Sequence, residues 1–162
     1  MYGSLKEVEA GAKRLAQVIL GASHLAQSVI PKLLTPTEDM INWRSTVRLM
    51  LEKQSIFICT RLDDCPGLEV VPPQGSMYAI VKIDITMFNG DDDNNTIKDD
   101  MDFSMKLLEE ENVFVLPGSA FGAANVFRIV FCPNETTLDA AATRIKHFCT
   151  RHTKNAQARK VN

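Results

Sequence analysis

The sequence predicts an α/β protein, specifically a two-layer α+β domain in which helices pack on one small sheet. The first observation is the order of elements expected from residue 35 onward, which is helix, strand, strand, helix, strand, strand, helix. The second is the composition, with 45% hydrophobic and 23% charged residues, which is typical of a globular protein. A length of 162 residues corresponds to one ordinary domain, or to a domain with an appended piece.

Two helices are expected before residue 35. Apolar residues recur at helical spacing from Ser4 to Ile19, and Gly21 is a typical helix stop. A second helix is expected over residues 23–34, which Pro31 would end or kink. Since these residues do not obviously belong to the core that follows, we expect a helical segment at residues 1–34 and a separate domain at residues 35–152.

A long helix opens the expected domain. Thr35 would cap this helix, Pro36 suits its first turn, and Glu38 completes a capping box. It is expected to run to about Arg61. The later elements are expected as strands at Leu68–Val71 and Met77–Ile85, a helix at Ile97–Glu111, strands at Val113–Leu116 and Phe127–Phe131, and a helix at Thr136–His152. Asn89–Asn95 is expected to be an exposed loop, and residues 153–162 a frayed tail.

Bulk properties exclude several classes of function. A formal net charge of −2 does not suggest a nucleic-acid or membrane-surface binder. No apolar run approaches the roughly 20 residues that span a bilayer, and residues 1–14 have no signal-peptide pattern. The expected compartment is the cytoplasm, although a chain that has lost its original N-terminus could have lost a targeting signal with it.

No metal site is expected either. The four cysteines match no zinc spacing and are expected to be reduced; they are Cys59, Cys65, Cys132 and Cys149. The acidic run Asp91-Asp92-Asp93 lacks the order of a calcium loop and is better interpreted as solvated.

Arg128 is the first candidate for a binding role, because it places a cation inside the apolar stretch Asn125–Phe131. An unpaired charge is costly to bury, so the guanidinium needs a partner. Its planar fork matches a carboxylate in two places, so a substrate carboxylate clamp is one interpretation, although the local sequence by itself favours a structural role. An internal ion pair, or an arginine that reaches solvent from an edge strand, is the alternative.

Two loops are weaker candidates. Val115–Gly122 leads from a strand into a turn of small residues that could admit a ligand, although an ordinary loop after a strand fits the pattern better. Gly75 suggests special backbone geometry before a strand. Tyr78 could point to a site, although packing in the sheet is favoured. The histidines have no evident nucleophile beside them, so no catalytic residue is assigned.

Several of these stretches, in this order and spacing, resemble one known family. They are Ala16-Gln17-Val18-Ile19-Leu20-Gly21 with Gln27, Gly67-Leu68 with Pro72, Gly75, Met77 and Tyr78, Leu107–Val113 with Leu116-Pro117-Gly118 and Phe121, Phe127-Arg128-Ile129, and Arg144-Ile145-Lys146 with Phe148-Cys149. Together they resemble the tyrosine aminotransferase branch of the class I aminotransferases, over roughly residues 5–152.

The resemblance implies the C-terminal small domain of a fold-type I enzyme, preceded by helices of a large domain. It implies pyridoxal 5'-phosphate as the cofactor of the complete enzyme, an amino acid and a 2-oxo acid as substrates, and a homodimer. It places Arg128 where the family binds the substrate carboxylate. The implied reaction transfers an amino group from an aromatic, tyrosine-like amino acid to a 2-oxo acid.

The sequence also departs from this family. The cofactor lysine in a Ser-x-x-Lys segment and the Gly-Trp-Arg-x-Gly stretch do not occur, so no cofactor-binding residue is assigned. The chain alone is therefore expected to be inactive. Two alternatives stay open, namely a non-catalytic interaction module derived from an aminotransferase small domain, and a fragment of an alanine-type aminotransferase.

Overall fold

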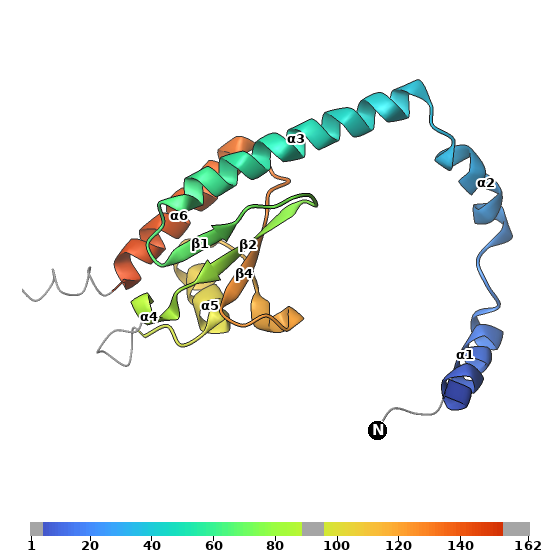
Figure 1. Cartoon of the computed structure of the whole chain (residues 1–162), viewed down its shortest axis with the longest axis horizontal. Helices are drawn as coiled ribbons and strands as arrows, with labels where there is room; N and C mark the ends of the chain where they lie inside the picture. Colours follow the sequence, from blue (N-terminus) through green and yellow to red (C-terminus); the bar gives the residue numbers. More distant parts are fainter. Residues whose placement is uncertain (1–4, 89–95, 154–162) are drawn as a thin grey trace, which may run out of the picture. The chain divides into compact units, whose positions relative to one another are not determined.

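The computed structural model describes residues 5–88 and 96–153, and it divides the chain into two compact units (Figure 1). The first unit is Met1–Arg44 and the second is Ser45–Asn162. The boundary falls inside helix α3 (Glu38–Asp63), ten residues beyond the boundary expected from the sequence at residues 34 and 35. The expected exposed loop Asn89–Asn95, its acidic run, and all but the first residue of the expected tail lie outside the described residues.

The first unit contains the two helices expected from the sequence, α1 (Leu5–Ile19) and α2 (His24–Leu34). Positive φ angles at Leu20 (62°) and Gly21 (104°) end α1. The Ser23 hydroxyl caps α2 by accepting from the Ala26 N–H at 3.4 Å. Pro31 does not end α2, because its carbonyl still accepts from the Thr35 N–H at 3.1 Å. Neither helix contains a buried residue.

The start predicted for the long helix is wrong by two residues. Helix α3 begins at Glu38, and the Thr37 hydroxyl accepts from the Met40 N–H at 3.3 Å. Thr35 instead closes α2, so it is not available as the cap of α3. A proline also disfavours the helical conformation in the residue before it, which keeps Thr35 extended.

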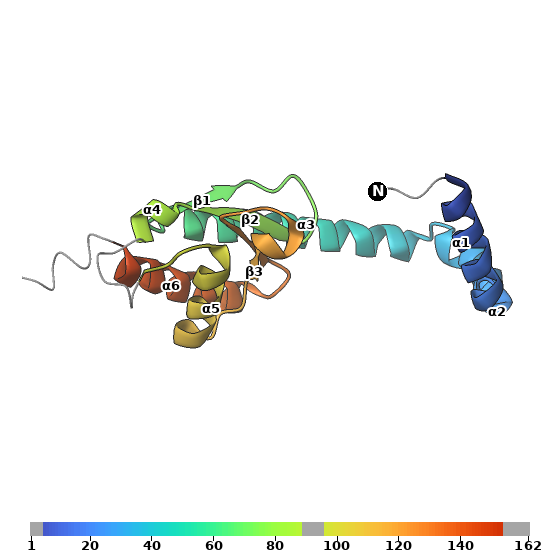
Figure 2. The same ribbon diagram turned by 90° about the horizontal axis from the view of Figure 1, so that it is seen from below.

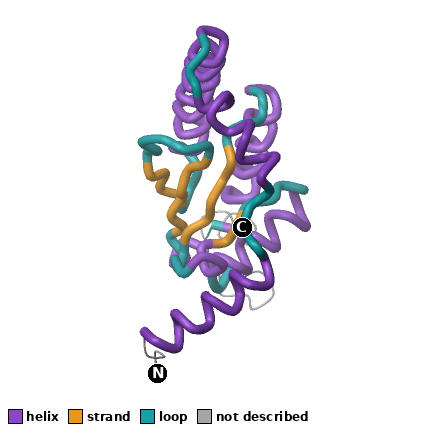
Figure 3. Tube along the Cα trace, turned by 90° about the vertical axis from the view of Figure 1, so that its right-hand side faces the viewer, coloured by secondary structure: helices purple, strands orange, loops and turns teal. Residues whose placement is uncertain are grey.

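The second unit is built on a four-stranded antiparallel sheet (Figure 3). Its strands are β1 (Leu68–Val71), β2 (Tyr78–Ile83), β3 (Leu116–Pro117) and β4 (Val126–Val130), in the order β1-β2-β4-β3. Alternate residues face opposite sides of a strand. The inner face carries the buried side chains of Ala79, Val81, Ile83, Pro117, Phe127 and Ile129.

Helices cover that inner face and complete the two-layer fold expected from the sequence. Helices α5 (Asp100–Glu111) and α6 (Glu135–His152) lie on one side of the strands (Figure 2). The C-terminal part of α3 adds Ile58 and Leu62 to the same core. Phe103 of α5 lies at the centre, with ring centroids 5.5 Å from Phe127 and 5.1 Å from Phe148.

Element boundaries differ from prediction where a polar side chain caps the backbone. Strand β2 ends at Ile83, and Ile85–Phe88 forms the short helix α4, with Asp84 accepting from the Thr86 N–H at 3.1 Å. Helix α5 begins at Asp100 instead of residue 97, because Asp99 accepts from the Asp102 N–H at 2.8 Å. Of the expected strand Val113–Leu116, only Leu116 belongs to the ladder.

Candidate functional site

Arg128 lies on β4, on the face of the sheet opposite the helices. Its strand neighbours Phe127 and Ile129 point into the core, so alternation directs Arg128 to the outer face. There it lies opposite Ile80 of β2 and Leu116 of β3. The Arg128 side chain is half-buried.

Two aromatic rings flank the Arg128 guanidinium. Its central carbon lies 4.7 Å from the ring centroid of Tyr78 and 5.6 Å from that of Phe121. Within residues 5–88 and 96–153, no hydrogen bond or ion pair involves this guanidinium, so the internal ion pair considered from the sequence is not observed there. The rings orient the cation without occupying its five N–H donors, which leaves the fork free for a carboxylate.

Tyr78 and Phe121 reach Arg128 from two different elements. Tyr78 begins β2, two register positions from Ile80, and its ring packs on the outer face of the sheet. Phe121 ends the short 3₁₀ helix η1 (Gly118–Phe121), which belongs to the loop that the sequence marked as a candidate. The special geometry expected at Gly75 occurs instead at Ser76, whose φ is 68°.

The loop that carries Phe121 is tightly closed. The Ala123 N–H donates to the Gly118 carbonyl at 2.9 Å, and Gly122 has a φ of +80°. A Cβ added at Gly118 would lie 2.0 Å from the Ala123 carbonyl oxygen, so only glycine fits there. The small residues of this loop therefore allow its backbone to close on itself. This agrees with the interpretation of Val115–Gly122 as an ordinary loop.

Asp100 is a buried charge that sequence reasoning missed. Its carboxylate accepts from the Ser119 N–H at 2.7 Å and from the Asn125 N–H at 3.1 Å, and only 2% of the residue is exposed. Burial raises the pKa of Asp100, but these hydrogen bonds outweigh burial and the pKa is lowered overall. The Asp99-Asp100 pair is typical of a helix start, and nothing local distinguishes the buried carboxylate from the exposed one.

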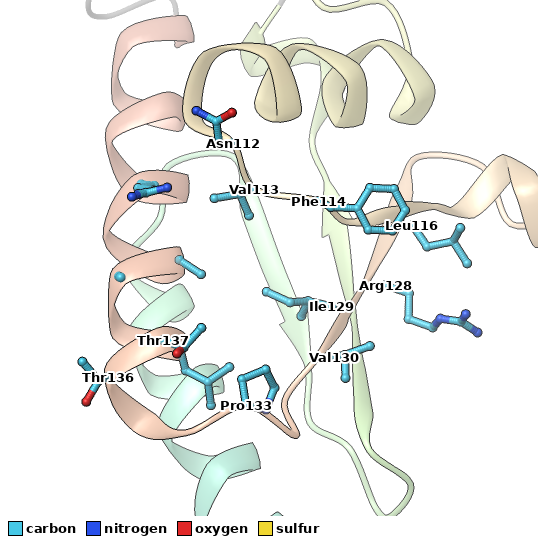
Figure 4. A pocket seen from close by; sticks show the side chains of 14 residues that line it. Asn112, Val113, Phe114, Leu116, Arg128, Ile129, Val130, Pro133, Thr136 and Thr137 are labelled. Atoms are coloured by element: carbon cyan, nitrogen blue, oxygen red, sulfur yellow. The ribbon is translucent and has the colours of Figure 1, made fainter.

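A pocket of about 650 Å³ lies between β4, α6 and the segment before β3 (Figure 4). Its lining is mainly apolar and includes Phe114, Ile129 and Pro133, with hydroxyl groups from Thr136 and Thr137. Arg128 contributes to the lining, but Figure 4 shows its guanidinium pointing away from the threonines. The pocket and the Arg128–Tyr78–Phe121 cluster therefore share Arg128, whose guanidinium lies in the cluster.

Among the described residues, the histidines, cysteines and acidic groups do not form a metal site. No group of three or more histidine, cysteine or acidic residues in the described part of the chain could hold a metal ion. The four cysteines are free, and burial, the largest cause, raises the pKa of Cys65 to about 11. His152 is buried against Phe148, and its Nε2 lies 2.9 Å from Glu110. These groups support the packing of α5 and α6.

Several solved structures similar to this chain are aminotransferases. A tyrosine aminotransferase from Leishmania infantum matches 90% of the chain and 34% of its own length, with a TM-score of 0.74 and 32% identity. An alanine aminotransferase from Pyrococcus furiosus matches 92% of the chain and 35% of its own length, with a TM-score of 0.70 and 29% identity. These neighbours confirm the fold-type I small-domain architecture expected from the sequence.

Sequence relatives agree with the structural neighbours. The tyrosine aminotransferase of Dictyostelium discoideum is 41% identical over 145 residues, which are 89% of this chain and 33% of that protein. The tyrosine aminotransferase of Caenorhabditis elegans is 34% identical over 93% of the chain and 30% of its own length. The chain thus spans about a third of the length of these relatives.

Within the two described stretches, no helix is both long enough and apolar enough to cross a membrane.

The family model for aminotransferase class I and II matches residues 1–145. This match covers most of the sequence and includes Arg128, Tyr78 and Phe121, the residues of the cluster on the outer face of the sheet. The chain therefore belongs to the class I and II aminotransferase family.

Proposed function

We propose that this chain is the C-terminal part of a tyrosine-type aminotransferase, in which Arg128 binds the carboxylate of the substrate. The complete enzyme would transfer an amino group from an aromatic amino acid to a 2-oxo acid. The observation that carries the proposal is a half-buried guanidinium that two rings hold and that no anion pairs with among the described residues. The names of the relatives support the aromatic donor.

The environment of Arg128 suits a carboxylate ligand. The rings of Tyr78 and Phe121 limit the positions of the guanidinium, so less conformational freedom is lost when it forms two parallel hydrogen bonds. Holding the substrate at its carboxylate also fixes the direction of its α-carbon bonds, which is a positioning contribution to catalysis. Arg128 would supply binding and orientation, and would move no proton.

The family implies pyridoxal 5'-phosphate for the complete enzyme, where this cofactor withdraws electrons from the α-carbon. The described residues do not fit its covalent attachment, because no lysine lines the pocket or contacts Arg128. Lys82 lies on the outer face near the cluster, but it pairs with Glu69 at 2.7 Å. We therefore propose that these 162 residues have no aminotransferase activity by themselves.

The arrangement of the complete protein is also part of the proposal. Residues 1–34 would be helices of the large domain, residues 35–152 the small domain, and residues 153–162 a frayed tail. The exposed apolar side chains of α1, including Leu5 and Val18, support a partner surface for the first of these segments. The complete enzyme would be a cytoplasmic homodimer that binds neither nucleic acid nor membranes.

Arg128→Lys and Arg128→Ala in the complete enzyme test the clamp. Loss of charge-assisted hydrogen bonds predicts a rise of about 10- to 100-fold in KM for the amino acid, larger for alanine than for lysine. Arg61→Lys is the matched control, because Arg61 pairs with Asp139 on the surface between α3 and α6. An unchanged KM in both Arg128 variants would show that Arg128 is not the clamp. Comparing kcat/KM for tyrosine and alanine separates the tyrosine-type enzyme from the alanine-type alternative.

A non-catalytic interaction module is the second candidate, and the exposed apolar residues of α1 and α2 favour it. An antibody against this chain, used on an immunoblot of the source cells, separates the two candidates. A band more than twice the calculated 18.0 kDa indicates a complete aminotransferase. A band at 18.0 kDa indicates that the cell uses these residues alone, which favours the module.

A further inference from the structure

We propose that Asp100 is a positioning residue for the carboxylate clamp, because its carboxylate fixes both ends of the loop that holds Phe121 against Arg128. This inference rests on the function proposed for Arg128. The Asp100 carboxylate accepts hydrogen bonds from the backbone of this loop, so it would act through the loop backbone.

The Asp100 carboxylate is not the cap of its own helix. Asp99 already caps α5 by accepting from the Asp102 N–H. The Asp100 carboxylate instead accepts from two N–H groups of a different segment, those of Ser119 and Asn125. No cation pairs with it among the residues that the structure describes, so these backbone donors compensate the loss of water around a nearly fully buried charge.

The two donors lie at opposite ends of the loop. Ser119 is the second residue of η1, and Asn125 immediately precedes β4. Asn125 has a φ of 57°, and its carbonyl accepts from the Ile83 N–H at 2.9 Å, so it is bound on both sides. One carboxylate therefore sets the distance between the start of the loop and the first residues of β4.

This distance determines how closely Phe121 approaches Arg128. Phe121 follows Ser119 by two residues, and Arg128 follows Asn125 by three. The ring of Phe121 lies 5.6 Å from the guanidinium carbon, near the outer limit of an effective cation–π contact, so a small displacement of the loop would abolish the contact. The ring of Tyr78 comes from β2 and does not depend on the loop. Loss of Asp100 should therefore remove one of the two rings and keep the other.

Asp100→Asn and Asp99→Asn form a matched pair, since they make the same chemical change at neighbouring positions of one helix. Asn caps a helix as well as Asp does, so Asp99→Asn should change little. The direct readout is the side-chain Nε–Hε NMR signal of Arg128 in the 162-residue chain, assigned with Arg128→Lys. The nearby ring faces shift this proton upfield, and Phe121→Leu shows the contribution of Phe121. We expect the signal in Asp100→Asn to move toward its position in Phe121→Leu, and the signal in Asp99→Asn to stay in place.

The proposal is overturned if the Arg128 signal in Asp100→Asn coincides with that of the wild-type chain while Phe121→Leu moves it. If Asp100→Asn does not fold, Asp100→Glu decides in its place. Glu keeps the charge, but its extra methylene must displace the donors that lie 2.7 and 3.1 Å from the carboxylate. An unmoved Arg128 signal in folded Asp100→Glu likewise overturns the proposal.

Kinetics of the complete enzyme supply the functional readout. Loss of one partly exposed cation–π contact predicts a rise of about two- to fivefold in KM for the amino acid, at unchanged kcat. In an enzyme that already carries Phe121→Leu, Asp100→Asn should not raise KM further. A general loss of stability would instead add its own effect to that of Phe121→Leu. If Arg128→Lys leaves KM unchanged, the clamp function fails, and the NMR comparison still decides whether Asp100 positions Phe121.

Discussion

Gly118→Ala is expected to destabilise the second unit by overpacking a closed loop, and therefore more than Gly75→Ala does. The added Cβ would lie 2.0 Å from the Ala123 carbonyl oxygen and 2.3 Å from Cγ2 of Val126. The nearest of these atoms belongs to the backbone of a loop that Asp100 holds at both ends, so it cannot yield by a change of rotamer. Overpacking of this severity costs about 3 kcal/mol, the upper part of its usual range.

A smaller opposing effect comes from the unfolded chain. Replacing glycine by alanine reduces the freedom of that chain and stabilises the folded state by about 0.4–1 kcal/mol. The expected net loss in the free energy of unfolding is therefore about 2 kcal/mol. Urea denaturation followed by circular dichroism measures this loss as a lower midpoint concentration of urea. The midpoint reports stability because the slope of the free energy of unfolding against urea concentration should stay the same.

Two control substitutions separate overpacking from backbone strain. An added Cβ meets no atom within 4 Å at either Gly75 or Gly122. Gly75 has an ordinary φ, so Gly75→Ala should be neutral or slightly stabilising. Gly122 has a φ of +80°, so Gly122→Ala should cost about 1–2 kcal/mol from strain alone. A Gly118→Ala chain as stable as Gly75→Ala would refute the reasoning about the closed loop.

Two further predictions concern ionisable groups. Burial raises the pKa of Glu110, but hydrogen bonds from His152 and Arg151 outweigh it and lower the pKa below its ordinary value of 4.5. A carboxyl group whose pKa is lowered in the folded state stabilises the fold at pH values above its ordinary pKa. This contribution is lost as the pH falls through the folded-state pKa. The wild-type chain should therefore be more stable than Glu110→Gln at neutral pH and lose that advantage below about pH 4, as measured by urea denaturation at each pH. A stability difference that does not change with pH would contradict this reasoning. Iodoacetamide at neutral pH should modify exposed Cys132 first, because burial raises the pKa values of Cys65 and Cys149. Mass spectrometry should find the two buried cysteines modified only in urea, and their modification in the folded chain would show that this core opens.

Periodic apolar patterns predicted the elements of the fold closely. β1 has the expected bounds, and α1 and α6 differ from prediction by one residue each. The errors occur where a polar side chain selects between neighbouring caps, as Thr37 does for α3 and Asp99 does for α5. Such choices differ by a small free energy and depend on the packing of the next element, which apolar spacing does not encode.

The sequence by itself determined that Arg128 lies in a strand and alternates with core residues, and hence that its guanidinium leaves the core face. Only the tertiary structure decided what surrounds that guanidinium. Tyr78 and Phe121 are distant from each other in the sequence, and they meet Arg128 because strand register and a closed loop bring them together. The same holds for Asp100, whose burial depends on backbone donors from a different segment of the chain. Local patterns determine which face a residue occupies, whereas contacts between distant segments depend on the packed chain as a whole.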